Sequence, residues 1–184
     1  PRSKDNIEVL PNPLNCVILD FQPQVGRVFY AKEYDPTASN VTPDCWSLDN
    51  RAPVDHAPNR QSTMCSVCVQ NSKGSGRDGR SKACSYSRRI VIWVPGYDEP
   101  FMVKLGGLSL FADAQPQNNQ FTFEDYGRQL SSGFGVPIDP SAVWTRLSFN
   151  PRQNVAALLM GFGQDANGQP FIDPQTAQIV TQLR

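Results

Sequence analysis

Residues 65–94 read CSVCVQNSKGSGRDGRSKACSYSRRIVIWV, and they join a cysteine-rich loop to an apolar β run. The stretch opens with the knuckle Cys65-Ser-Val-Cys68, and a Cys-x2-Cys turn directs two thiolates at one ion. Single cysteines on either side, Cys45 and Cys84, bring the number of candidate ligands to four. The pattern Cys-x19-Cys-x2-Cys-x15-Cys therefore predicts a structural Zn²⁺ site.

Other roles for these cysteines stay open: disulfides, a redox pair, or buried apolar thiols. A disulfide scaffold usually has an even number of cysteines, whereas this chain has five, and Cys16 lies in an apolar run typical of a core. A redox Cys-x2-Cys motif opens a helix, but residues 58–83 are rich in Ser, Gly, Asn and Arg and predict a loop. His56, the only histidine, could replace one ligand. Four cysteines already complete the coordination, so His56 is expected to be a bystander.

Length and hydropathy favour one domain that spans residues 1–184, with a zinc-binding insertion at about 42–87. The sequence contains no signal peptide and no long apolar segment. We therefore expect a cytoplasmic protein without a membrane partner.

Charge is distributed unevenly along the chain, although the formal net charge is zero. Residues 45–92 carry eight Lys or Arg and three Asp or Glu, a net charge of +5, whereas residues 1–44 and 93–184 carry −2 and −3. A zinc ion with four thiolates would lower the central charge by about two and leave it positive. The cations that crowd together are Lys73, Arg77, Arg80, Lys82, Arg88 and Arg89. They predict contacts with phosphate, and a solvated, flexible loop is the alternative.

Hydrophobic patterning predicts a mainly β domain with one or two short helices. The expected strands are 14–21, 24–31, 88–94, 101–110, 142–149 and 155–163. A helix is expected over 122–132, with Thr122 as its N-cap, and a second helix over 174–183. Five to six strands with a long insert between the second and third suit a small barrel of the oligonucleotide-binding (OB) type, and a sandwich is the alternative.

Strand alternation places an arginine and an aromatic side chain on the same face of three runs. Aromatic rings stack on unpaired bases, and arginine neutralises phosphate or stacks by a cation-π contact. The three pairs are Arg27 with Phe29, Arg89 with Trp93, and Trp144 with Arg146. They predict a nucleic-acid-binding face, while a core role is the alternative for each tryptophan.

Several of these motifs together resemble phage-encoded single-stranded DNA-binding proteins with a zinc-binding segment. The resemblance rests on Cys45-Trp46-Ser47, Cys65-x2-Cys68, Gly74-Ser75, and Cys84 followed by Arg88-Arg89, and it covers about residues 14–110. It implies an OB barrel that coats single strands during replication or recombination, with a structural role for the four cysteines. The chain departs from that pattern because it shows no acidic C-terminal tail and because His56 has no clear counterpart.

Catalytic motifs are weak. Gly74-x-Gly76-x-x-Gly79 formally matches a dinucleotide fingerprint, but it lies between cysteines rather than between a strand and a helix. One histidine cannot form a histidine-based acid-base pair. We therefore expect a non-enzymatic protein that binds single-stranded DNA and works with replication or recombination proteins. The alternative is a zinc-stabilised protein-interaction module, such as a transcription or replication accessory factor.

Overall fold

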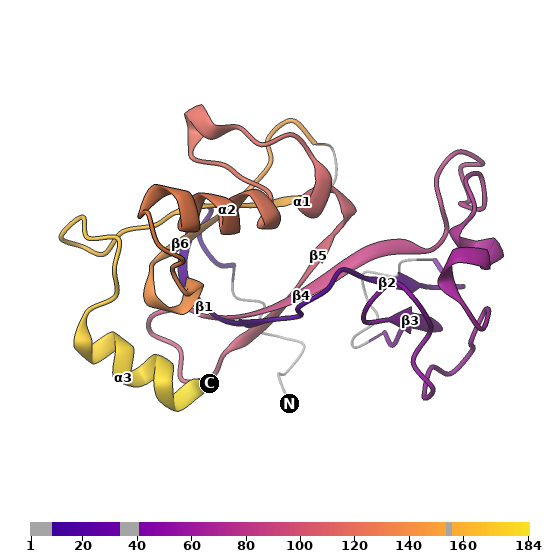
Figure 1. Ribbon diagram of the computed structural model, residues 1–184, viewed down its shortest axis with the longest axis horizontal. Helices are drawn as coiled ribbons and strands as arrows, with labels where there is room; N and C mark the ends of the chain where they lie inside the picture. Colours follow the sequence, from indigo (N-terminus) through magenta and orange to yellow (C-terminus); the bar gives the residue numbers. More distant parts are fainter. Residues whose placement is uncertain (1–8, 34–40, 154–155) are drawn as a thin grey trace. The chain divides into compact units, whose positions relative to one another are not determined.

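The computed structural model describes residues 9–33, 41–153 and 156–184 as a mixed α/β fold (Figure 1). The described strands are β1 (Leu14–Phe21), β2 (Gly26–Phe29), β3 (Cys45–Ser47), β4 (Ser85–Trp93), β5 (Phe101–Gly106), β6 (Thr145–Phe149) and β7 (Leu158–Phe162). The α-helices in the same ranges are α1 (Gly107–Phe111), α2 (Phe123–Gly133) and α3 (Pro174–Leu183). None of these helices has the length and apolar character needed to cross a bilayer.

The strands form an antiparallel sheet that is open rather than closed. Hydrogen bonding gives the order β3-β2-β4-β1-β6-β7, and β5 pairs with β4 beside this path. β3 and β7 end the order and do not pair with each other, so the expectation of a closed barrel is wrong for the described residues. The fold is also more helical than the mainly β expectation. Alternating sequence predicts strands, but whether the outer strands meet depends on twist and on which elements cover the faces.

Contacts divide the chain into two compact units, which we describe separately. The first unit contains the described residues up to Asp20, Val91–Phe101 and Phe111–Arg184. The second unit contains Phe21–Ile90 and Met102–Leu110 and therefore includes the cysteine-rich segment.

In the first unit, α2 begins where the sequence predicts. The Thr122 side chain accepts a hydrogen bond from the Asp125 backbone N–H and caps the first turn. The helix buries Tyr126 and Leu130. The hydroxyls of Tyr126 and Thr145 are hydrogen-bonded at 2.9 Å, and burial raises the pKa of Tyr126 to about 12. This contact attaches α2 to β6.

Other predicted elements match the structure to different degrees. The strand at 14–21 and the helix at 174–183 are confirmed with the same bounds. The strand expected at 88–94 is β4, and it pairs with β5. The predicted strand at 101–110 is wrong in its second half, because the chain turns into α1 at Gly107. The predicted strands at 24–31 and 142–149 are each shorter in the structure. The strand predicted at 155–163 is also shorter over its described part, and residue 155 lies outside the described residues. The short strand β3 was not predicted, because three residues are too few to show alternation.

Candidate functional site

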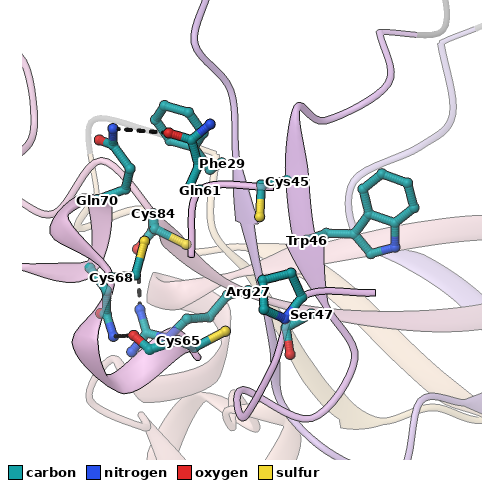
Figure 2. A pocket seen from close by; sticks show the side chains of 12 residues that line it. Arg27, Phe29, Cys45, Trp46, Ser47, Gln61, Cys65, Cys68, Gln70 and Cys84 are labelled. Carbon is teal, nitrogen blue, oxygen red and sulfur yellow. Dashed lines mark hydrogen bonds between the residues drawn. The ribbon is translucent and has the colours of Figure 1, made fainter. Parts of the chain in front are cut away.

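Four cysteines of the second unit line one small cavity (Figure 2). Cys45, Cys65, Cys68 and Cys84 are each between 6% and 8% exposed. The cavity has a volume of about 10 Å³, which is about the space that one water molecule needs. It therefore suits a single ion and is far too small for an organic cofactor.

Backbone hydrogen bonds bring these cysteines together from three places in the chain: β3, the knuckle and the residue before β4. The Cys65 N–H donates to the Arg51 carbonyl at 2.8 Å, and the Cys68 N–H donates to the Cys65 carbonyl at 3.4 Å. The Cys84 N–H donates to the Gln70 carbonyl at 2.8 Å, so the last cysteine lies next to the turn that follows the knuckle. Cys45 lies on β3 opposite Phe29 of β2.

The side chains do not form a finished metal site. All five cysteines of the chain are free, and no group of three or more His, Cys, Asp or Glu in the described ranges is positioned to hold a metal ion. Burial raises the pKa of the Cys84 thiol to about 11 and also raises that of Cys65. Four thiols around a cavity the size of one ion nevertheless match the ligand chemistry of structural zinc. Cys16 lies apart from them in the core of the first unit, as predicted, with 0% exposure.

Arg27 also lines the cysteine cavity and is only 3% exposed. Its Nε donates to Asn50 Oδ1, and its Nη1 donates to the Cys84 carbonyl at 3.2 Å. The guanidinium lies 4.0 Å from the centre of the Tyr86 ring. Arg27 is therefore not exposed as its place on a binding face requires, because its guanidinium is buried and bonds to these two oxygens. Its role in nucleic-acid binding stays a prediction. Phe29 is also buried, because it packs against Cys45 and Cys84, and its contact with nucleic acid likewise stays a prediction.

Arg88 is a second cation that the structure removes from the predicted surface. Its Nε donates to the Gln22 carbonyl at 2.7 Å, and its Nη2 donates to the Pro23 carbonyl at 2.8 Å. Because its guanidinium is buried against backbone carbonyls, Arg88 holds the segment after β1 and does not present a phosphate contact. Arg89, the next residue on β4, is half-buried.

The two tryptophans of the predicted binding face belong to the core of the first unit. Trp93 and Trp144 are 6% and 7% exposed, and their ring centres are 6.4 Å apart. They cluster with Val17 and Leu19 of β1 and with Val180 of α3. The predicted alternation along the strands is preserved, but α3 covers this face, so the prediction of exposed stacking rings is wrong.

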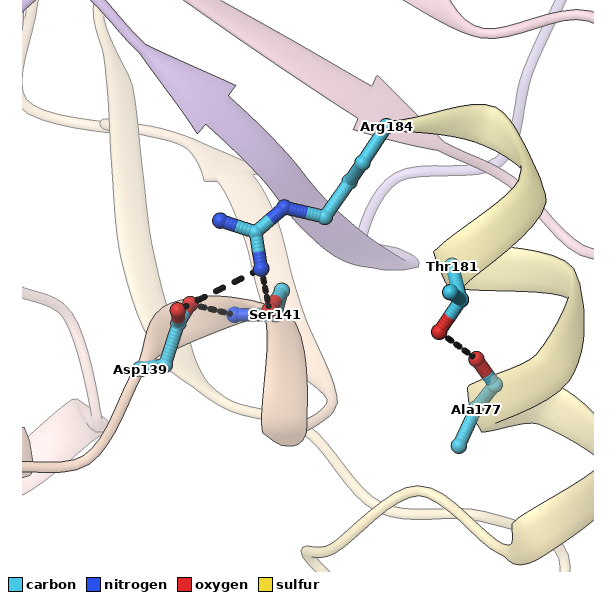
Figure 3. A network of polar contacts seen from close by, with 5 residues as sticks. All are labelled: Asp139, Ser141, Ala177, Thr181 and Arg184. Carbon is cyan, nitrogen blue, oxygen red and sulfur yellow. Dashed lines mark hydrogen bonds and ion pairs between the residues drawn. The ribbon is translucent and has the colours of Figure 1, made fainter.

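Polar contacts hold the end of α3 against the turn before β6 (Figure 3). Arg184 Nη1 donates to Ser141 Oγ at 2.9 Å and forms an ion pair with Asp139 Oδ2 at 3.4 Å. At the other end, the Asp173 carboxylate accepts hydrogen bonds from the N–H groups of Gln175 and Thr176. Both ends of the helix are therefore fixed.

The remaining predicted cations lie on an exposed loop of the second unit, residues 73–82, which we call the basic loop. Lys73, Arg77, Arg80 and Lys82 are all exposed. Its only acid, Asp78, accepts hydrogen bonds from the Arg80 and Ser81 N–H groups and from the Ser81 hydroxyl. These bonds lower the pKa of Asp78 to about 2. The acid shapes the loop, while the four cations are exposed.

Partners inside the second unit moderate this charge. Arg77 forms an ion pair with Glu33 at 2.9 Å and donates to the Ala31 carbonyl. Lys82 donates to Asn71 Oδ1 at 3.1 Å.

His56 is exposed, packs edge-on against Trp46 with the ring centres 5.2 Å apart, and is not part of the cavity lining.

The last predicted contact, Arg146 on β6, is half-buried and lines an open groove of the first unit. This groove, the buried position of Arg27 and the cover that α3 provides do not follow from the sequence pattern. The apolar pair Val180 and Leu183 indicates that α3 packs against another element, because three-residue spacing gives a helix an apolar stripe that must be buried.

No family model, curated protein or solved structure matches this chain.

Proposed function

We propose that this chain is a non-enzymatic single-stranded DNA-binding protein of replication or recombination, with a basic loop organised by a structural zinc ion. One observation carries the proposal. Four exposed cations occupy the same short loop, and Asp78, the only acid within that loop, accepts hydrogen bonds from Arg80 and Ser81 of the loop itself. Phosphate binding depends on such a cluster, because each neutralised phosphate releases condensed counterions.

Zinc is the second part of the proposal. Cys45, Cys65, Cys68 and Cys84 would hold the ion, which supplies cross-links between β3, the knuckle and the start of β4. Four thiolates and Zn²⁺ carry a net charge of −2, and the buried guanidinium of Arg27 beside the cavity offsets part of it. The basic loop lies between Cys68 and Cys84, so zinc would hold both of its ends.

The scaffold is compatible with the resemblance to phage single-strand binders. OB folds are partly open antiparallel barrels whose strands and loops carry the binding residues. We propose that the open antiparallel sheet of this chain serves as a related scaffold for the basic loop.

The test is a titration of a fluorescently labelled dT oligonucleotide at several salt concentrations. Removal of two loop cations in Arg80→Ala/Lys82→Ala should lower the affinity and shallow the log-log salt slope by about 1.4, since each single-strand contact contributes about 0.7. The matched control Arg128→Ala/Arg152→Ala also removes two exposed cations and should leave the slope unchanged. Wild-type protein that binds neither DNA nor RNA single strands would contradict the proposal.

A specific surface favours the alternative, a protein-interaction module. Met64, Val67 and Val69 surround the cysteine knuckle and are 50%, 67% and 75% exposed. Exposed apolar side chains beside a basic loop suit an amphipathic, acidic protein segment. A salt slope that is identical in wild type and in Arg80→Ala/Lys82→Ala would favour this second function.

A further inference from the structure

The first unit contains an open groove of about 700 Å³ at one end of its sheet. The groove runs between the turn after β4 and the segment after β7. Its polar and aromatic lining includes Asn15, Tyr97, Asn119, Arg146, Phe162 and Gln164.

Strand register explains why Arg146 reaches this groove. Arg146 lies opposite Asn15 of β1 and Gly161 of β7, so these three positions share one face of the sheet. Trp144 shares that face two residues earlier, but α3 covers it. The face is therefore closed over Trp144 by the helix and remains open at Arg146.

The loop before α2 closes the other side of the groove. Asn119 pairs with the Phe162 backbone through two hydrogen bonds of 2.8 Å. Its carbonyl oxygen lies 2.1 Å from where a Cβ on Gly161 would be, so only glycine lets this loop approach the strand. Gln120 Nε2 donates to Ser148 Oγ at 3.0 Å and covers the next position on this face. Arg146 thus lies between two covered regions.

Arg146 has an unused donor at this point. Its Nε is buried and has no hydrogen-bond partner in the described structure. The described residues that line the groove include no Asp or Glu. A buried guanidinium donor without a partner costs free energy. Because no described lining residue supplies a carboxylate, the positive charge of Arg146 would attract an anionic oxygen into the groove.

Tyr97 contributes an aromatic surface to the same groove. Its ring packs edge-on against Phe101 at 5.2 Å, and its carbonyl accepts a hydrogen bond from Trp93 Nε1 at 2.9 Å. These contacts set the orientation of the turn, while the side chain stays half-buried. A flat ring held in this way can stack on an unpaired base.

We propose that this groove binds one unpaired nucleotide of a single strand, with Arg146 on a phosphate oxygen and Tyr97 against the base. The proposal rests on the proposed function and assigns it a stacking subsite in the first unit. A nucleotide fits better than a simple anion, because the groove combines a guanidinium with an aromatic ring and with the amides of Asn15 and Gln164.

Binding of a dT oligonucleotide to four variants tests the subsite. Arg146→Gln should weaken binding about tenfold and shallow the salt slope by about 0.7. Tyr97→Ala should weaken binding about tenfold without changing the slope, because stacking releases no counterions. Tyr97→Phe should bind like wild type, and Arg146→Lys should keep the slope while recovering only part of the affinity.

Photocross-linking of wild-type protein provides a readout that does not depend on the stability of any variant. An oligonucleotide that carries 5-iodouracil should cross-link to Tyr97, and peptide mass spectrometry locates the bond. Cross-links confined to the basic loop, together with wild-type affinity of Arg146→Gln and Tyr97→Ala, would overturn the subsite and leave the proposed function intact. Complete absence of single-strand binding by wild type would overturn both.

Discussion

Arg27 Nη1 donates a hydrogen bond to the backbone carbonyl of Cys84 at 3.2 Å, and both residues line the cysteine cavity. The guanidinium therefore connects β2 to the cysteine that immediately precedes β4. If the four cysteines bind zinc as proposed, the four-thiolate site would be negatively charged, and the buried Arg27 cation would then have an electrostatic role as well as a structural one.

The first prediction concerns metal content. Purified protein should contain about one zinc ion per chain by elemental analysis, because four thiolates complete a tetrahedral site. Cys65→Ser or Cys68→Ser should release the ion and expose the basic loop to proteolysis, since this segment has few apolar residues to order it otherwise. His56→Ala is the control and should retain the metal. Metal-free protein with paired cysteines would contradict the prediction.

The second prediction concerns Arg27. Arg27→Ala should lower the free energy of unfolding by about 2–4 kcal/mol, because it leaves Asn50 Oδ1 and the Cys84 carbonyl without this donor in a buried environment. It should also speed the loss of zinc to a chelator. The control Arg60→Ala removes an exposed ion pair with Asp55 and should cost less than about 1 kcal/mol. Equal stability of the two variants would show that Arg27 is not a structural cation.

The third prediction concerns the cover that α3 provides. Trp144→Ala should cost about 3–5 kcal/mol of stability, because a buried indole leaves a cavity. Val180→Ala on α3 should cost about 2 kcal/mol, whereas Arg184→Ala should cost less than about 1 kcal/mol, since its ion pair is exposed. Denaturant unfolding measures all three values. If Trp144→Ala left the free energy of unfolding unchanged, the core role of Trp144 would be contradicted and the predicted binding role would be favoured again.

The fourth prediction concerns Tyr126 and pH. The folded state raises the pKa of Tyr126 from 10.0 to about 12 through burial. Folding therefore favours the protonated phenol, and this stabilisation is complete below pH 10 and is lost as pH rises from about 10 to 12. Tyr126→Phe should cost about 1–2 kcal/mol at neutral pH, because Thr145 Oγ1 loses its partner.

The pH dependence separates this effect from simple loss of packing. The difference in stability between wild type and Tyr126→Phe should shrink between pH 10 and 12 as the wild-type phenol ionises. A difference that stays constant over that range would mean that Tyr126 ionises without cost and is not held as a buried neutral phenol.

Local sequence predicted the elements whose signals lie within a few residues. Thr122 is the N-cap of α2, the apolar run after Pro13 forms β1, and the C-terminal helix begins at Pro174. Cysteine spacing also grouped Cys45, Cys65, Cys68 and Cys84, and these four line one cavity. Their role as zinc ligands stays a prediction. The exposure of the cations on residues 73–82 could also be predicted from the sequence, because this segment contains no large apolar side chain that would bury it.

Only the tertiary structure decided which faces are covered. Alternation correctly places Trp93 on β4, Arg146 on β6 and Trp144 just before β6, but period-two patterns are the same whether a helix or solvent meets that face. α3 packs on the two tryptophans, while Arg146 two residues further along meets the open groove. The sequence pattern likewise does not distinguish Arg27 from Arg80. In the structure Arg27 is buried and donates to the Cys84 carbonyl, whereas Arg80 is exposed to solvent. The difference depends on long-range packing, which juxtaposes residues that are far apart in the chain.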